Sequence, residues 1–260
     1  MPILLASPEN KIKLANQYRA NGDFDRAIFG YRSAANNGMS EAMFYLGRAY
    51  ENGEGVGKDT EKAIQYYLDA SNYGLSEAQM NLGVLFKERG KEGDAEKAVQ
   101  WTKKAAEAGE VDACSNLAKW YLEGKIVQKD LSESLKWRGI AAKAGDGIAC
   151  YQLALHYLDG IGVGKNIEMA EENFKKAFIT LSKKENHRNL SAVLTLANMY
   201  RKGRGTSIDY EKALEYYYLA NHLADEVGVQ IKQDVVLELE NGIDSKRVKE
   251  IKNLVDTNFK

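Results

Sequence analysis

The chain has 260 residues, of which 44% are hydrophobic and 28% charged, so it can bury a core and remain soluble. Its 36 lysines and arginines nearly balance 37 aspartates and glutamates, which excludes an overall field that attracts nucleic acid or an anionic membrane. With only 2 prolines the chain can be helical almost throughout, and no apolar run approaches the roughly 20 residues of a membrane span. The apolar start is too short for a signal peptide, so the sequence as written predicts a cytoplasmic protein, or a periplasmic or secreted one if a leader was removed.

The first predicted element is a helical hairpin over residues 7–38. Leu14 and Tyr18 lie on one stripe of its first helix, and Ala27 and Tyr31 lie four residues apart on its second. An Ala-Asn-Gly-Asp turn separates the two patterns, which predicts antiparallel neighbours joined by a tight connection.

After this hairpin the chain repeats itself five times between residues 39 and 222. The first helix of each unit carries an alanine, a leucine and an aromatic residue at positions i, i+4 and i+8, which puts all three on one helical stripe. The leucines of this stripe are Leu46, Leu82, Leu117, Leu153 and Leu196. This regular spacing predicts that each unit buries the same face of its first helix.

A second helix follows a loop in each unit. It is predicted to begin at a side chain that accepts hydrogen bonds from the free N–H groups of a helix start, namely Asp59, Asp94, Asp130, Asn166 or Asp209. In three units it ends at Gly74, Gly109 or Gly145, where glycine supplies a left-handed stop.

Two departures from the repeat are visible. The leucine of the fifth unit follows that of the fourth by 43 residues rather than 36, which predicts a longer second helix or a bulging loop near residues 181–189. From residue 223 to 260 the period ends, and the pattern predicts two capping helices. The first contains Val229, Val236 and Leu237 and stops at Gly242, and Ser245 is expected to cap the second.

Residues 7–38 resemble a tetratricopeptide repeat, and the five units of residues 39–222, with their longer loop, resemble Sel-one-like (SLR) repeats of the same superfamily. The resemblance implies an all-α fold, a right-handed α–α superhelix. Residues 1–260 would form a single solenoid of about six helical hairpins, closed by the capping helices of residues 223–260.

The segment of residues 51–63, Glu-Asn-Gly-Glu-Gly-Val-Gly-Lys-Asp-Thr-Glu-Lys-Ala, has the glycines and lysine of a phosphate-binding loop. Asn52 stands where the first glycine of that motif belongs, and Asp59 stands where its serine or threonine belongs. The sister loop at residues 160–166 departs from the motif at the same two places. The sequence therefore predicts an inter-helix turn, and no cofactor.

No catalytic or metal site is predicted. Cys114 and Cys150 occupy the same column of neighbouring units and are expected to be reduced thiols, while His156, His187 and His222 lie at no metal-ligand spacing. Relatives to which β-lactam hydrolysis has been attributed have paired cysteines in each repeat. This chain lacks those pairs and any Ser-x-x-Lys motif, so a β-lactam-binding hydrolase is only the alternative of another class.

The resemblance implies that the first helix of each unit lines a concave wall, with positions two before, two after and five after its leucine available to a partner. The wall positions expected to bind are Phe44, Arg48, Met80, Val84, Lys119, Leu122, Tyr151, Leu155, Leu158, Asn198 and Arg201, and Asn16 and Arg19 hold equivalent places in the first hairpin. A tetratricopeptide carboxylate clamp is not expected, because Ile12 stands where its first lysine belongs. The apolar wall positions could instead be covered by the insertion at residues 181–189 or by the tail.

The expected function is that of a non-catalytic scaffold or adaptor, a monomer that binds a protein or peptide in the concave groove and neither binds nucleic acid nor inserts into a membrane. An immunity protein that neutralises a secreted bacterial toxin is the alternative within binding functions.

Overall fold

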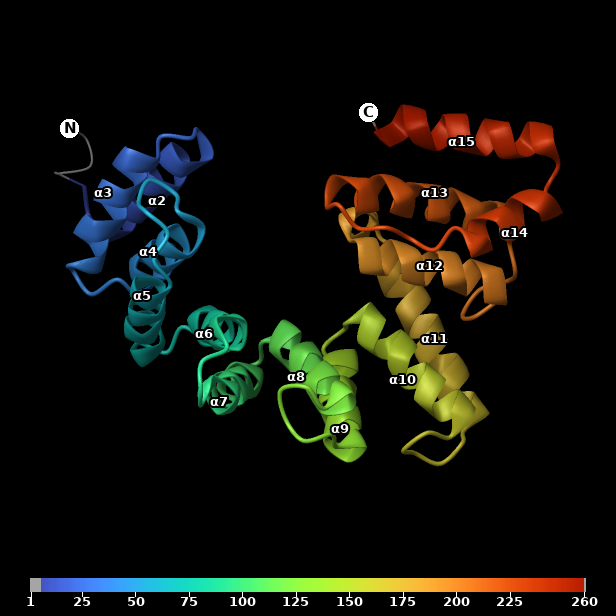
Figure 1. Cartoon of the computed structure of the whole chain (residues 1–260), viewed down its shortest axis with the longest axis horizontal. Helices are drawn as coiled ribbons and strands as arrows, with labels where there is room; N and C mark the ends of the chain where they lie inside the picture. Colours follow the sequence, from blue (N-terminus) through green and yellow to red (C-terminus); the bar gives the residue numbers. More distant parts are fainter. Residues whose placement is uncertain (1–5, 260) are drawn as a thin grey trace. The chain divides into compact units, whose positions relative to one another are not determined.

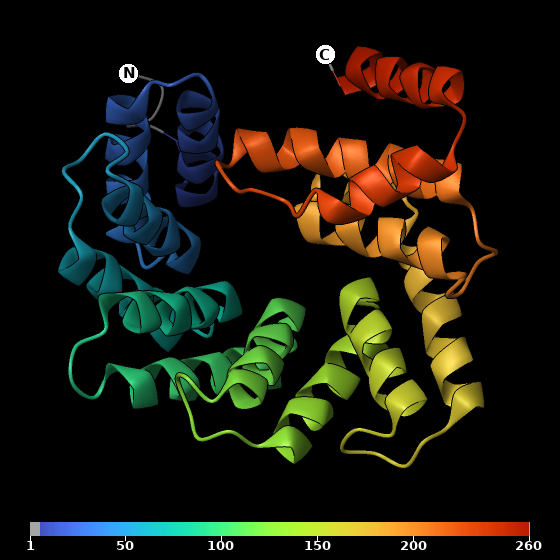
Figure 2. The ribbon, with the colours of Figure 1, turned by 45° about the vertical axis from the view of Figure 1, so that its right-hand side comes forward.

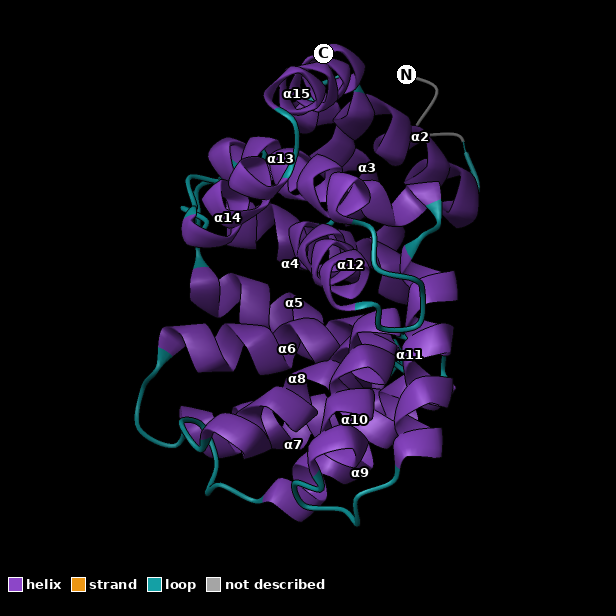
Figure 3. Ribbon diagram, turned by 90° about the vertical axis from the view of Figure 1, so that its right-hand side faces the viewer, coloured by secondary structure: helices purple, strands orange, loops and turns teal. Residues whose placement is uncertain are grey.

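A computed structural model describes residues 6–259, and all its regular elements are helices, α2 to α15 and one 3-10 helix, η1 (Figures 1 and 3). These residues fall into two compact units, 6–130 and 131–259, with the boundary inside the third repeat. The expected all-α class built from helical hairpins is confirmed. The two units are described separately below.

The first unit contains three complete hairpins and the first helix of the third repeat. Its helices are α2 (Pro8–Ala20), α3 (Phe24–Ala35), α4 (Ser40–Asn52), α5 (Thr60–Asn72), α6 (Ser76–Arg89), α7 (Asp94–Glu107) and α8 (Val111–Glu123). Within each hairpin the two helices pack along their length, and the second helix also contacts the first helix of the next hairpin. A continuous stack of helices therefore forms in chain order.

The second unit continues the pattern and adds the insertion and the tail. Its elements are α9 (Leu131–Lys143), α10 (Gly147–Asp159), α11 (Ile167–Leu181), η1 (Lys184–Arg188), α12 (Leu190–Lys202), α13 (Tyr210–Glu226), α14 (Asp234–Gly242) and α15 (Ser245–Phe259). Both forms predicted for the insertion occur, because α11 has 15 residues against 13 in α9 and η1 then fills the added segment.

The predicted stripe of the first helices forms the core. Leu46, Leu82, Leu117 and Leu196 are each at most 1% exposed, whereas Leu153 is only half-buried. The small residue that follows the leucine allows close packing, since a side chain on Gly47 would lie 2.7 Å from the ring of Tyr67 in α5. The alanine and leucine columns, and the small residue after each leucine, thus mark where helices pack against one another.

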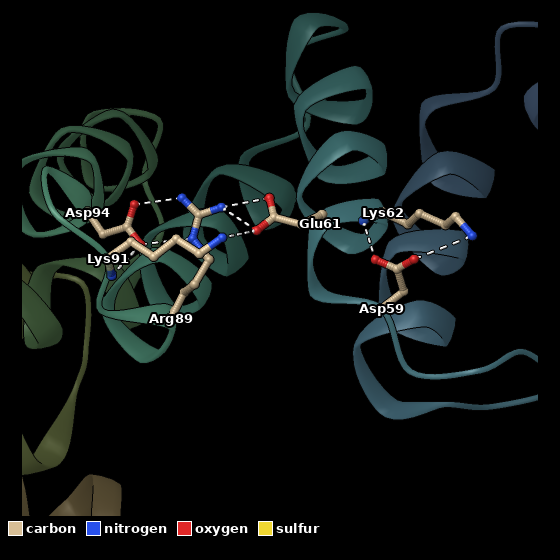
Figure 4. A network of polar contacts seen from close by, with 6 residues as sticks. All are labelled: Asp59, Glu61, Lys62, Arg89, Lys91 and Asp94. Carbon is tan, nitrogen blue, oxygen red and sulfur yellow. Dashed lines mark hydrogen bonds and ion pairs between the residues drawn. The ribbon is translucent and has the colours of Figure 1, made fainter.

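Asp59, Asn166 and Asp209 cap their helices as predicted, each accepting from the backbone N–H three residues ahead. The prediction for Asp94 was wrong in its role. Asp94 is 1% exposed and lies in the first turn of α7, where it pairs with Arg89 at 2.6 Å and accepts from the backbone N–H of Lys91 at 2.9 Å. Figure 4 shows Arg89 between Asp94 and Glu61, so this arginine joins α7 to the start of α5.

The longer loop of three repeats contains a Gly-x-Gly turn, at Gly53–Gly55, Gly160–Gly162 and Gly203–Gly205, and all six glycines have positive φ. The second glycine of each turn lies against the second helix of the preceding hairpin. An added Cβ would lie 2.7 Å from Phe24 Cβ at Gly55, and 2.6 Å from the carbonyl carbon of Phe174 at Gly205. Gly55 of the phosphate-loop-like segment is therefore needed for packing between repeats.

The tail forms the two predicted helices, and both pack against α13, the second helix of the last repeat (Figure 2). Val236, Leu239, Ile251 and Val255 are buried in this contact, which closes the end of the array. Three details differ from the prediction. Val229 and Leu237 are exposed, and the cap of α15 is Asp244 rather than Ser245, because its carboxylate accepts from the N–H groups of the next turn.

Candidate partner-binding surface

In the first unit the expected wall positions lie on α4, α6 and α8. Phe44, Arg48, Met80, Val84 and Leu122 are half-buried, and Lys119 is exposed. The ring of Phe44 lies 5.7 Å from that of Tyr67 on the partner helix of its hairpin, so part of its surface belongs to the core. Met80, Val84 and Leu122 therefore keep part of their apolar surface exposed on the first helices of successive hairpins.

An open cavity of about 490 Å³ lies at the start of this wall, where α2 and α4 meet the Gly53–Gly55 turn. Its lining brings together three wall positions, Asn16, Arg19 and Arg48, with Tyr45 and Glu54. Glu54, the middle residue of the turn, receives a bidentate ion pair from Arg19, with Nε to Oε2 at 2.7 Å and Nη2 to Oε1 at 3.2 Å. These hydrogen bonds lower the pKa of Glu54 and raise that of Arg19, so both remain charged.

Sequence reasoning missed Glu54 and Tyr45. The available signal was the Gly-x-Gly pattern itself, because its middle residue reaches back to the preceding hairpin in two repeats. Glu54 binds Arg19 on α2, and Arg204 donates from Nη1 to the hydroxyl of Tyr151 on α10 at 3.0 Å. In a third repeat the carbonyl oxygen of Ile161 lies 2.9 Å from Nδ1 of His156.

In the second unit Tyr151, Leu155 and Leu158 are half-buried and pack against the cluster formed by Ala154, Ala170 and Phe174. The guanidinium of Arg204 lies over the Phe174 ring at 5.3 Å and covers part of Tyr151 as well. Tyr151 is therefore partly occupied by the neighbouring repeat, whereas Leu155 and Leu158 keep apolar surface at the wall.

Asn198 and Arg201, the wall positions on α12, are half-buried. The amide oxygen of Asn198 accepts from the hydroxyl of Tyr217 on α13 at 3.1 Å. Tyr31 makes the same contact to Asn16, and Tyr67 makes a related one to Glu51, at 2.6 and 2.5 Å. A buried tyrosine of the second helix therefore holds a polar wall residue of the first helix in these three hairpins.

The insertion and the tail cover only part of the apolar wall. The insertion places His187 edge-on against Tyr216 of α13, at 5.5 Å between ring centroids. The tail cluster contacts Leu194, the wall position two before Leu196, but its core and its packed neighbours include neither Leu155 nor Leu158.

Arg138 replaces the tyrosine of the second-helix column in the third repeat. It is 3% exposed, and desolvation lowers its pKa. Its Nη1 lies 2.8 Å from Nε2 of His156, whose Nδ1 faces the Ile161 carbonyl. A neutral imidazole that donates from Nδ1 and accepts at Nε2 satisfies both contacts, so His156 has a structural role here.

The described residues hold no group of three or more histidine, cysteine, aspartate or glutamate side chains suited to a metal ion. Cys114 and Cys150 are buried and free, and burial raises the pKa of both thiols. None of the helices in residues 6–259 is long and apolar enough to cross a membrane.

The family profile of the Sel1 repeat matches residues 40–72, 76–110, 111–146, 147–178 and 191–225. The chain belongs to the Sel1 repeat family. Sel1 repeats generally mediate protein–protein interactions, and their helical fold typically serves as a non-catalytic scaffold. The five matched stretches coincide with the five units recognised from the sequence. A search of curated proteins finds no significant match.

Solved structures give the same assignment. A Sel1 repeat protein from Oxalobacter formigenes is 25% identical over 95% of this chain and 99% of its own, with a TM-score of 0.67. The protective antigen c5321 of uropathogenic Escherichia coli, which displays an SLR fold, is 26% identical with a TM-score of 0.66. The match covers 94% of this chain but 54% of that antigen, so this chain spans about half the antigen's length. The immunity protein PA5088 of Pseudomonas aeruginosa, 21% identical over 84% of this chain and 85% of its own, shares the fold with a TM-score of 0.50.

Proposed function

We propose that this protein is a non-catalytic adaptor whose Sel1 repeats bind a protein or peptide partner along the exposed face of their first helices. The observation that carries the proposal is that apolar side chains on that face are only partly buried. Met80, Val84 and Leu122 in the first unit, and Leu155 and Leu158 in the second, are apolar but only half-buried. Within each unit these apolar side chains lie at wall positions of the first helices and offer a partner area to bury.

The surroundings of these side chains support a binding role over a purely structural one. Hydrogen bonds fix the polar wall residues in place, from Tyr217 to Asn198 and from Arg19 to Glu54. Preorganised side chains lose less conformational entropy when a partner binds. The alternative of a toxin-neutralising immunity protein is supported by a shared fold alone.

The test is affinity capture from the native host with the wild type and paired variants. Lys119→Glu changes an exposed wall position on α8, and Leu155→Glu changes the apolar wall on α10. Lys175→Glu and Ile179→Glu make the same chemical changes on α11, a second helix, where Lys175 is exposed and Ile179 is 68% exposed.

The proposal predicts that the two wall variants lose a protein that the wild type and both α11 variants retain. Far-ultraviolet circular dichroism and melting curves confirm that each variant is folded before it is compared. Capture of the same proteins by all five forms would reject binding through the first helices.

A further inference from the structure

The cavity formed by α2, α4 and the Gly53–Gly55 turn has an excess of hydrogen-bond donors. Both oxygens of its one carboxylate are already engaged, because Glu54 accepts from Nε and Nη2 of Arg19 and also from Nδ2 of Asn52 at 3.2 Å. The ion pair with Arg19 neutralises its charge. No other acidic residue lines the cavity.

The donors left over come from Asn16 and Arg48. The amide oxygen of Asn16 is occupied by the hydroxyl of Tyr31 at 2.6 Å, and burial raises the pKa of Tyr31 to about 12, so this tyrosine remains a donor. Both N–H groups of the Asn16 amide are then without a partner among the described residues. Arg48 is half-buried and has no direct hydrogen bond or ion pair within residues 6–259, although its charge acts on Glu54 at longer range and helps to lower the pKa of that carboxyl.

The cavity therefore keeps one net positive charge, from Arg48, after Arg19 and Glu54 cancel. The cavity, of about 490 Å³, is open to solvent and can admit one small polar group of a partner. A guanidinium fork beside an amide N–H matches the paired oxygens of a carboxylate. Tyr45, which stacks on Tyr31 with ring centroids 4.9 Å apart, supplies a fixed wall for the carbon atoms next to it.

We infer that this cavity is a carboxylate-binding site, in which Arg48 and Asn16 hold an acidic group of the partner. The inference deepens the proposed function, on which it rests, by stating the chemistry that the partner presents at the first repeats. The carboxylate can belong to an acidic side chain or to a chain terminus, since both carry the same oxygen pair.

The test is a nuclear magnetic resonance titration of the full chain, with the Arg48 Nε–H and Asn16 Nδ2–H₂ signals as reporters. N-acetyl-glutamic acid α-amide presents only a side-chain carboxylate, and N-acetyl-alanine presents only a terminal one. Uncharged N-acetyl-glutamine amide and sodium sulfate at matched ionic strength are the controls.

At least one carboxylate probe is expected to shift both reporters saturably, and the stronger of the two identifies the source. Arg48→Gln should weaken this binding about tenfold or more, whereas Arg26→Gln removes the same charge from an exposed site on α3, where it pairs with Asp23, and should leave it unchanged. The inference is overturned by unshifted reporters at 50-fold excess of both probes over about 1 mM protein, or by equal shifts with the amide or with sulfate. A carboxylate site that fails while partner capture persists leaves the proposed function standing.

Discussion

The Gly-x-Gly turns are required by packing, and replacing Gly205 with alanine tests this directly. Gly205 has a φ of +71°, and its added Cβ would lie 2.6 Å from the carbonyl carbon of Phe174 and 3.0 Å from the backbone nitrogen of Lys175. Both obstacles are backbone atoms of α11, so no side-chain rotation can relieve the contact.

Two costs therefore add at this position. The left-handed conformation costs a residue with a side chain about 1–2 kcal/mol. Displacing the backbone of a packed helix adds about 1–3 kcal/mol, as overpacking does elsewhere. Gly205→Ala should thus lower the free energy of unfolding by about 2–5 kcal/mol.

Two control substitutions separate the costs. Gly228 has a φ of +68° with nothing near its Cβ position, so Gly228→Ala should show only the conformational cost of about 1–2 kcal/mol. Gly164 has neither a positive φ nor a neighbour within 4 Å, so Gly164→Ala should be neutral or stabilising by up to about 1 kcal/mol. Urea unfolding followed by circular dichroism measures all three. Equal losses for Gly205→Ala and Gly228→Ala would refute the packing argument.

Three further predictions follow from buried polar groups. Arg89 holds the pKa of Asp94 at about 2, below its ordinary value of 3.8. The extra stability of the wild type over Asp94→Asn should therefore be complete above pH 4 and disappear only as the pH falls toward 2. Urea midpoints of the two proteins that already converge at pH 5 would contradict this. Tyr67→Phe removes the hydrogen bond to Glu51 and should lower the free energy of unfolding by about 1 kcal/mol in the same assay. The hydroxyl of Tyr66 makes no hydrogen bond within residues 6–259, so Tyr66→Phe should leave the free energy of unfolding almost unchanged. Cys114 and Cys150, buried with raised pKa, should resist a thiol reagent such as dithionitrobenzoate in the native protein and react, two per chain, in denaturant; rapid reaction of the native protein would argue against their burial.

Much of the fold could be predicted from the sequence because each repeat restates the same physical constraints. The alanine, leucine and aromatic columns set one buried stripe per first helix, and Asp59 and Asn166 mark starts of second helices with their caps. Asp94 shows the limit of this reasoning. The loop of its repeat turns at Gly93 instead, and Arg89 then draws the carboxylate into a buried ion pair.

The site was harder to predict because its polar contacts join residues far apart in the chain. The resemblance to known repeats placed Arg48 and Asn16 on the wall, but it could not show that Glu54 would neutralise Arg19 and leave Arg48 without a direct ion pair. The same holds for Tyr151, which the resemblance placed on the apolar wall and which Arg204 partly covers from 53 positions further along the chain. Pairings of this kind depend on loop conformation, which local spacing does not determine.

The proposed binding surface lies on the first helices, and an equilibrium titration with the captured partner tests this most directly. Lys119→Glu and Leu155→Glu should each raise Kd at least about tenfold, or about 1.4 kcal/mol, whereas Lys175→Glu and Ile179→Glu should stay within about twofold of wild type. Unchanged affinity in both wall variants would contradict binding through the first helices. A loss confined to the two α11 variants would also contradict it and would place the partner on a second helix.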